Sequence, residues 1–220
     1  MIKCYFGVPG VGKSTILVKE YKKNKRKYDH IYTINVQIKG VEMITKEDLE
    51  KYKFKNTLIL WDEITMDADN REFKSFSKPL RDFFILHRHL GCDIIYATQN
   101  FENVDKKVRD LTCELWYMSK SVVPLLRSFT SSKRIYRKIN INEHTSELTL
   151  GYRFCNFLES IFVSNFKLVF RPFYYKYFDT HDELSLKERI LYEERNKEIK
   201  EKKVEEFSDY LNNLASMFNE

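Results

Sequence analysis

The chain has 220 residues, of which 43% are hydrophobic and 15% aromatic, so it can bury a sizeable core and is not disordered throughout. Its four cysteines are far apart in sequence, which argues against a disulfide scaffold and favours reduced thiols in a cytosol. No apolar stretch is long enough to span a bilayer, and the net charge of +6 gives a general preference for polyanionic partners.

The first predicted elements are a strand at Ile2–Phe6 and a helix at Thr15–Tyr21. The residues that join them fill every fixed position of a phosphate-binding loop: Gly7, Val8, Pro9, Gly10, Val11, Gly12, Lys13, Ser14 and Thr15. Glycines let backbone N–H groups turn toward phosphate oxygens, and the helix N-terminus adds its positive end. We predict that this loop binds a nucleoside triphosphate, with Lys13 on the β- and γ-phosphates and Ser14 on Mg²⁺. The alternative, a glycine-rich turn with a chance lysine, is disfavoured by the flanking elements.

Strands and helices then alternate along the chain. Further strands are predicted at 31–36, 57–61, 93–97 and 114–118, and further helices at 46–52, between 71 and 90, and at 105–111. In the second of these helices, Leu80, Phe83, Phe84 and His87 share one face, and Pro79 lies near its start. This alternation predicts an α/β P-loop NTPase with a mainly parallel sheet flanked by helices.

The pattern changes after about residue 133. Arg134–Asn142 and Glu147–Phe154 predict a hairpin, and Phe154–Tyr175 predicts a packed β-rich segment. A capping box from Ser185 to Glu188 then begins a long charged helix whose apolar stripe is expected to dock on its own domain, or otherwise on another subunit. We therefore divide the chain into a P-loop ATPase core (1–130), a β-rich extension (131–182) and a C-terminal helix (183–220).

Two acidic residues, Asp62 and Glu63, follow the apolar run Leu58–Trp61. We expect this strand to lie beside the phosphate loop, so that Asp62 joins Ser14 in holding the magnesium shell. Glu63 is expected to point the other way and to act as the base that polarises the attacking water. The alternative is a solvent-facing acidic pair at the end of a strand.

Polar residues also end the next strand, where Gln99 is the candidate sensor of the γ-phosphate, unless it only forms a strand-end turn. The nearby sequence His87–Cys92 contains two histidines and a cysteine, but alternate residues on a helix diverge, which disfavours a metal site. Arg88 is instead a candidate arginine finger that acts on the γ-phosphate of a neighbouring subunit. Arg81 and Arg109 are alternatives for this role, and each of the three is otherwise an ordinary surface arginine.

Together these residues resemble the zonular occludens toxin-like family, the assembly ATPases of filamentous phages. The resemblance rests on Gly7–Thr15, Leu58–Glu63, Arg88–Gly91 before Asp93–Ile95, and Thr98–Gln99, with a weaker likeness at Tyr175–Thr180. It implies an additional-strand P-loop ATPase that hydrolyses ATP to drive the assembly and export of single-stranded DNA virions at a membrane. Members usually carry a membrane-spanning helix after the ATPase domain, whereas this sequence predicts a charged helix there.

The resemblance further implies a homo-oligomer, expected as a ring, that acts on single-stranded DNA or a DNA–protein complex. Phage coat proteins and a membrane-embedded assembly partner are the expected partners, in the host cytoplasm at the inner face of the membrane. The alternatives are a DNA packaging, translocating or helicase-type ATPase and, less favoured by the presence of Lys13, Asp62 and Glu63, a non-hydrolysing nucleotide-gated scaffold.

Overall fold

The structure is a computed structural model that describes residues 1–51, 54–68, 77–121, 127–141, 148–156 and 165–177. The chain divides into two units, Met1–Phe178 and Asp179–Glu220, and all of the described residues belong to the first. The C-terminal helix predicted at 183–220 therefore lies outside the described residues.

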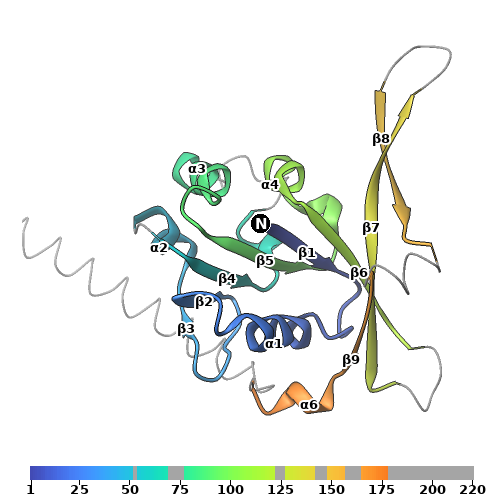
Figure 1. Cartoon of the computed structure of the whole chain (residues 1–220), viewed down its shortest axis with the longest axis horizontal. Coiled ribbons are helices and arrows are strands. Elements are labelled where there is room, and N and C mark those ends of the chain that lie inside the picture. Colours follow the sequence, from blue (N-terminus) through green and yellow to red (C-terminus); the bar gives the residue numbers. More distant parts are fainter. Residues whose placement is uncertain (52–53, 69–76, 122–126, 142–147, 157–164, 178–220) are drawn as a thin grey trace, which may run out of the picture. The chain divides into compact units, whose positions relative to one another are not determined.

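The first unit is built on a single sheet (Figure 1), with the strands in the order β3-β2-β4-β5-β1-β6-β7-β8 and with β9 paired to β7. The strands are β1 (Ile2–Phe6), β2 (His30–Ile34), β3 (Glu42–Met43), β4 (Thr57–Trp61), β5 (Asp93–Thr98), β6 (Glu114–Lys120), β7 (Phe129–Ile141), β8 (Leu148–Phe154) and β9 (Phe166–Phe170). All pairings from β3 to β6 are parallel, and those made by β7 are antiparallel. The predicted α/β class with a mainly parallel sheet is confirmed.

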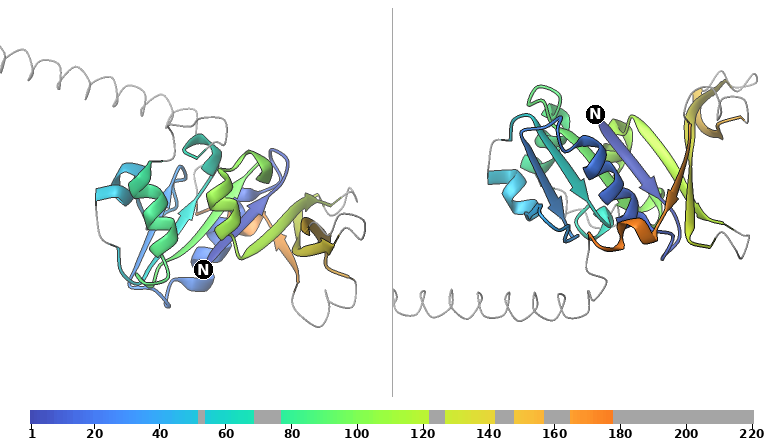
Figure 2. Two further views of the ribbon diagram at one scale, coloured as in Figure 1. Left: turned by 90° about the horizontal axis from the view of Figure 1, so that it is seen from above. Right: turned by 60° about the horizontal axis from the view of Figure 1, so that its bottom comes forward.

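Helices cover both faces of the parallel strands. They are α1 (Lys13–Asn24), α2 (Lys46–Lys51), α3 (Lys78–Leu86), α4 (Lys106–Leu111) and α6 (Pro172–Tyr175), with 3-10 turns at Ile64–Met66 and Phe101–Asn103. Figure 2 shows α3 and α4 over one face of the sheet and α1 with α6 over the other. Helix α3 begins where the Ser77 hydroxyl accepts a hydrogen bond from the Leu80 N–H, with Pro79 in the first turn. Within the described residues, no helix is long and apolar enough to cross a membrane.

Strand β4 shows how the two faces are filled. All five of its residues are buried, as expected for a strand between two helical layers. Ile59 and Trp61 pack in the core beneath α3, together with Phe84 of that helix. Leu58 and Leu60 face the opposite way and pack in the core beneath α1.

The order of the inner strands is the one implied by the resemblance to an additional-strand P-loop ATPase. β4, which leads to the acidic pair, is not next to β1, because β5 lies between them and pairs with both: Ile94 is level with Ile2 on one side and with Ile59 on the other. A continuous apolar run is equally compatible with any inner position in a sheet, so this run alone did not determine its neighbour. Because parallel strands end at one edge of a sheet, the residues after β4 still reach the loop after β1 across the end of β5.

The sheet continues without a break into the β-rich part of the chain. β7 pairs with β6 along one edge, whereas β8 and β9 pair with different halves of its other edge. The antiparallel pairing of β7 with β8 confirms the predicted hairpin. The expected boundary at residue 130 falls inside β7, and the division of the chain into three parts stays a prediction.

Candidate nucleotide-binding site

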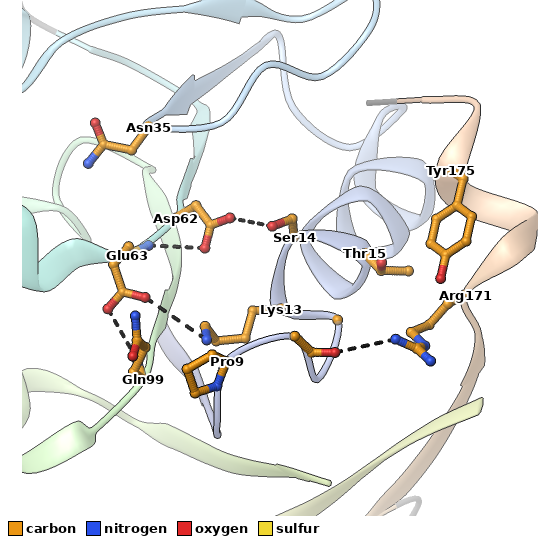
Figure 3. Close-up of a pocket in the computed structure, with 12 residues that line it drawn as sticks. Pro9, Lys13, Ser14, Thr15, Asn35, Asp62, Glu63, Gln99, Arg171 and Tyr175 are labelled. Atoms are coloured by element: carbon orange, nitrogen blue, oxygen red, sulfur yellow. Dashed lines mark hydrogen bonds and ion pairs between the residues drawn. The ribbon is translucent and has the colours of Figure 1, made fainter. Parts of the chain in front are cut away.

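A cleft of about 380 Å³ opens at the carboxyl edge of the parallel strands (Figure 3). Loops that follow β1, β2, β4 and β5 form most of it, and the segment after β9 closes one end. The lining residues are Pro9, Gly10, Gly12, Lys13, Ser14, Thr15, Asn35, Asp62, Glu63, Gln99, Arg171 and Tyr175. The structure thus brings the predicted loop, both carboxylates and Gln99 to one place.

The phosphate loop requires glycine at two positions for different reasons. Gly12 has a φ of +97° and immediately precedes α1, where a side chain would strain the backbone. Gly7 packs so closely on β6 that a Cβ atom would lie 2.6 Å from the Met118 carbonyl oxygen. The Lys13 Nζ atom lies 3.2 Å from the Gly7 carbonyl oxygen and donates a hydrogen bond to it, so the lysine side chain folds back across the loop.

Backbone N–H groups at the start of α1 are placed to bind an anion. The first intrahelical bond runs from Ile16 N to the Gly12 carbonyl oxygen at 3.1 Å, so the amides of Lys13, Ser14 and Thr15 have no intrahelical acceptor. Amides in this position, together with the positive end of the helix dipole, form an anion site.

Three of the predicted loop residues do not line the cleft: Gly7, Val8 and Val11. Val11 is completely buried in the core beneath α1, and Val8 is 59% exposed. They set the path of the loop, while the lining residues on either side of them face the cleft.

The loop carbonyl groups are held from outside by the β-rich part of the chain. The Thr130 hydroxyl of β7 donates a 2.6 Å hydrogen bond to the Val11 carbonyl oxygen. Arg171, which precedes α6, donates from Nη1 to the Gly10 carbonyl oxygen at 3.3 Å. Residues at least 119 positions away in sequence therefore fix the shape of the loop.

Ser14 and Asp62 meet directly across the cleft. The Ser14 hydroxyl donates a 2.5 Å hydrogen bond to Asp62 Oδ2, and the Glu63 N–H donates to Oδ1 at 3.0 Å. Burial raises the pKa of the Asp62 carboxyl above its usual range, although the bond from Ser14 and the nearby Lys13 oppose the rise. A buried carboxylate of this kind is stabilised by a cation.

The Ser14 hydroxyl oxygen and Asp62 Oδ2 are suitable ligands for Mg²⁺. Mg²⁺ prefers oxygen ligands and usually takes one or two from the protein and the rest from phosphate and water. Within the described part of the chain no group of three or more His, Cys, Asp or Glu side chains could hold a metal ion by itself. In the segment His87–Cys92, the His87 ring is buried with Nδ1 2.7 Å from the Phe84 carbonyl oxygen.

Glu63 occupies the same cleft as Asp62, contrary to the expected alternation. β4 ends at Trp61, and Glu63 has a φ of +44°, so the period of two that holds within a strand no longer applies. Its Oε2 atom lies 4.0 Å from Lys13 Nζ, and its Oε1 atom accepts a 2.8 Å bond from the Thr65 hydroxyl. The carboxylate is thereby fixed beside the lysine.

Gln99 contacts Glu63 through its backbone. Its N–H donates a 3.2 Å hydrogen bond to Glu63 Oε1, and the side chain lines the cleft. The inserted strand β5 thus delivers both a support for the carboxylate and a polar side chain. The γ-phosphate-sensing role of Gln99 stays a prediction.

Arg88 is not in this cleft. It is exposed after the end of α3, and its Nη2 atom lies 3.6 Å from the sulfur of Cys113, just before β6 begins. This is the amino edge of the sheet, separated from the cleft by the length of a strand, about 17–20 Å. Arg81 pairs with its neighbour Asp82, and Arg109 pairs with Glu102. An action of any of these arginines on another subunit stays a prediction.

Three lining residues were missed from the sequence: Asn35, Arg171 and Tyr175. Asn35 could have been found, because it directly follows a parallel strand, β2, at the edge where ligands bind. Its φ of +59° and the 2.6 Å bond from its Nδ2 to Asp67 Oδ2 hold it there. Arg171 carries no motif, and Tyr175 belongs only to the weaker family likeness at Tyr175–Thr180, which gave it no role in the site. The tertiary structure brings both residues to the cleft.

The strand order, the glycine loop and the facing acidic pair define a P-loop NTPase in which an additional strand separates the loop strand from the acidic strand. The chain belongs to the zonular occludens toxin (Zot) family, whose sequence model matches residues 1–149. No curated protein matches the sequence significantly.

Several solved structures are similar to this chain. The N-terminal domain of zonular occludens toxin from Neisseria meningitidis is similar with a TM-score of 0.54 at 14% sequence identity, over 81% of this chain and 98% of that domain. The flagellar accessory protein FlaH from Methanocaldococcus jannaschii has a TM-score of 0.45 at 12% identity, over 70% of this chain and 89% of that one. The genome packaging NTPase B204 of Sulfolobus turreted icosahedral virus 2, in complex with ATP-gammaS, has a TM-score of 0.44 at 12% identity, over 68% and 95% of the two chains.

Proposed function

We propose that the chain hydrolyses ATP and works as a motor that drives the assembly and export of filamentous phage virions. The observation that carries the hydrolytic part is the position of Glu63. Its carboxylate lies between Lys13 and the Gln99 N–H, in the cleft where Ser14 and Asp62 also meet. A carboxylate held in this way can take a proton from a water molecule that attacks the γ-phosphate.

Each side chain has a distinct task in this proposal. The α1 amides and Lys13 bind and orient the phosphates, and Ser14 and Asp62 hold Mg²⁺. When bound, Mg²⁺ supplies positive charge to the phosphate oxygens. Glu63 accepts the proton, the Gln99 N–H keeps Glu63 in position, and the Gln99 side chain orients the water.

Membership of the Zot family supports the assembly role. In this proposal the chain forms a ring in the host cytoplasm at the inner face of the membrane. There it would meet coat proteins and a membrane-embedded partner, and its cargo would be single-stranded DNA or a DNA–protein complex. A DNA packaging or translocating motor uses the same core with another cargo.

The test of hydrolysis is steady-state ATP turnover of Glu63→Gln, with Glu47→Gln as a matched control on the exposed surface of α2. We expect turnover to fall at least about 100-fold in Glu63→Gln, while ATP binding persists and the control is unaffected. Lys13→Ala is expected to lose both binding and turnover. Normal turnover in Glu63→Gln would remove Glu63 as the base.

The cargo is tested separately. ATP turnover is measured with single-stranded and with duplex DNA, and the Lys13→Ala gene is tested for virion release from infected cells. Stimulation by single-stranded DNA together with loss of release supports the assembly motor. Strand separation of duplex DNA with normal release would favour the helicase alternative.

A further inference from the structure

We infer that Arg171 and Tyr175 form the end of the cleft that holds the ribose and base of the nucleotide, within the same subunit. This inference rests on the nucleotide-binding part of the proposed function. It assigns a binding task to the segment after β9, for which the sequence predicted no ligand contact.

The cleft has two chemically different ends (Figure 3). Lys13, Glu63 and Gln99 gather at one end, where the γ-phosphate belongs if Glu63 is the base. Thr15, Arg171 and Tyr175 gather at the opposite end. A triphosphate that reaches Glu63 and lies along the start of α1 must therefore extend its α-phosphate, ribose and base toward this second end.

The guanidinium of Arg171 is suited to an anionic ligand. It donates from Nη1 to the Gly10 carbonyl oxygen and from Nη2 to the Arg127 carbonyl oxygen, and its Nε atom is buried without a hydrogen-bond partner among the described residues. No carboxylate of the described residues makes an ion pair with it. A guanidinium has five N–H donors, so donors remain for a phosphate or ribose oxygen. A cation without a counter-ion at the mouth of an anion-binding loop favours a polyphosphate ligand.

Tyr175 supplies an aromatic wall beside Arg171. It lies on α6 and is 43% exposed at the cleft. The segment around it is anchored: Lys22 of α1 donates a 2.9 Å hydrogen bond to the Tyr177 hydroxyl, and Lys39 N donates to the Tyr177 carbonyl oxygen at 2.8 Å. An aromatic ring on an anchored segment at the open end of a phosphate site is suited to stack on a base, and stacking tolerates any base.

A purely structural role for Arg171 would consist of capping the Gly10 and Arg127 carbonyl groups. Thr130 makes the equivalent contact to Val11 without a charge. Thr130→Val therefore serves as the matched variant, because it removes a neighbouring cap and leaves every charge in place.

The test for Tyr175 compares binding of ATP and of inorganic triphosphate, both with Mg²⁺, by calorimetry. We expect Tyr175→Ala to weaken ATP binding about tenfold and to leave triphosphate binding unchanged. Tyr175→Phe should bind ATP normally, as should Phe173→Ala, which removes a 53% exposed aromatic ring of α6 outside the cleft. The base-stacking role would be overturned if Tyr175→Ala bound ATP as tightly as the unmodified chain does. It would also be overturned if the variant lost ATP binding and triphosphate binding to the same extent.

The test for Arg171 measures ATP affinity against salt concentration. We expect Arg171→Ala to weaken ATP binding at least about tenfold and to flatten the salt dependence, because one cation in contact with the ligand is lost. Arg171→Lys and Thr130→Val should both keep the salt dependence of ATP affinity seen in the unmodified chain. An unchanged salt dependence in Arg171→Ala would mean that Arg171 only caps carbonyl groups and does not contact the ligand. If the unmodified chain binds no ATP, or if Lys13→Ala binds ATP as well as the unmodified chain does, the proposed function itself is wrong.

Discussion

Lys167 of β9 lies 2.9 Å from Glu20 of α1, and the two side chains form an ion pair between the late β-rich segment and the helix that follows the phosphate loop. The Glu20 carboxylate also accepts from the Tyr5 hydroxyl, and Lys3 lies 3.9 Å away. The Glu20 side chain is only 4% exposed. This cluster fixes β9, and with it the segment that carries Arg171, against the first helix.

The first prediction concerns the stability that this pair provides. Lys167→Met leaves the buried Glu20 carboxylate with fewer partners, and we expect a loss of about 1–3 kcal/mol of unfolding free energy. Lys138→Met, at an exposed position of β7, is the control and should change little. Urea denaturation measures both, and equal stability of the two variants would contradict a structural role for the pair.

The second prediction is the pH dependence that Glu20 causes. Burial alone would raise the pKa of Glu20, but Lys3, Lys167 and the Tyr5 hydroxyl outweigh it and lower the pKa from 4.5 to about 2. A carboxylate with a lowered pKa stabilises the fold above pH 4.5, and this contribution is lost as the pH falls toward 2. It is on the order of 3 kcal/mol, partly offset because burial also lowers the pKa of Lys167. In Glu20→Gln the acid-induced loss of stability between pH 5 and pH 2 should therefore be smaller, as thermal unfolding across this range would show.

The third prediction compares two glycines that both have a positive φ. At Gly12 (φ +97°) a Cβ atom would lie 2.9 Å from Arg171 Cδ and 3.2 Å from the Thr130 hydroxyl oxygen, whereas at Gly40 (φ +80°) no atom of the described part of the chain lies within 4 Å. We expect Gly40→Ala to lose about 1 kcal/mol from backbone strain alone. Gly12→Ala should lose more stability and abolish ATP binding. Normal ATP affinity in Gly12→Ala, measured by calorimetry, would show that the loop tolerates displacement.

The fourth prediction concerns magnesium. Ser14→Ala removes one of the two protein oxygens that would hold Mg²⁺, and Asp62→Asn replaces the other, charged ligand with a neutral amide. The unmodified chain should bind ATP more tightly with Mg²⁺ than with EDTA, and both variants should lose most of this difference. Ser119→Ala removes a hydroxyl that pairs with Ser131 outside the cleft and should keep the difference. A full Mg²⁺ effect in Asp62→Asn would mean that the ion is held elsewhere.

The fifth prediction tests an arginine acting between subunits. Because Arg88 lies at the opposite edge of the sheet from its own cleft, Arg88→Ala should lower ATP turnover and leave ATP binding intact. Mixing Arg88→Ala with Glu63→Gln subunits should raise turnover above the sum of the two separate preparations, since some sites then combine both intact residues. Arg26→Ala, an exposed arginine beyond the end of α1, is the control. Wild-type turnover of Arg88→Ala would exclude this arginine.

Local features of the sequence were sufficient for much of the fold. The strand, glycine loop and helix at the start are encoded within 24 residues, and the buried run of β4 points directly to Asp62 and Glu63. The predicted hairpin likewise depends on residues that are close in sequence. Such elements can be predicted from the sequence because hydrophobic periodicity and turn-forming residues act between positions that are close in sequence.

The features of the fold and the site that local sequence patterns do not determine depend on pairing between strands that are far apart in sequence. The apolar patterns of inner strands are interchangeable, so the insertion of β5 between β1 and β4 was implied by the family resemblance and not by the strand patterns themselves. Arg171 and Tyr175 reach the cleft only because β9 pairs with the first half of β7. The direction of the Glu63 side chain was misread because β4 ends at Trp61, so the alternation within a strand does not extend to Glu63.

The alignment of β7 within the sheet also governs the nucleotide loop. Thr130 stands level with Lys120 on one side and Val169 on the other, and its hydroxyl reaches the Val11 carbonyl group. Side chains alternate between the faces of a strand, so a slip of one residue would turn this hydroxyl to the far side and present Phe129 or Ser131 instead. The strand pairing at the outer edge of the molecule is therefore a condition for a correctly shaped phosphate cradle.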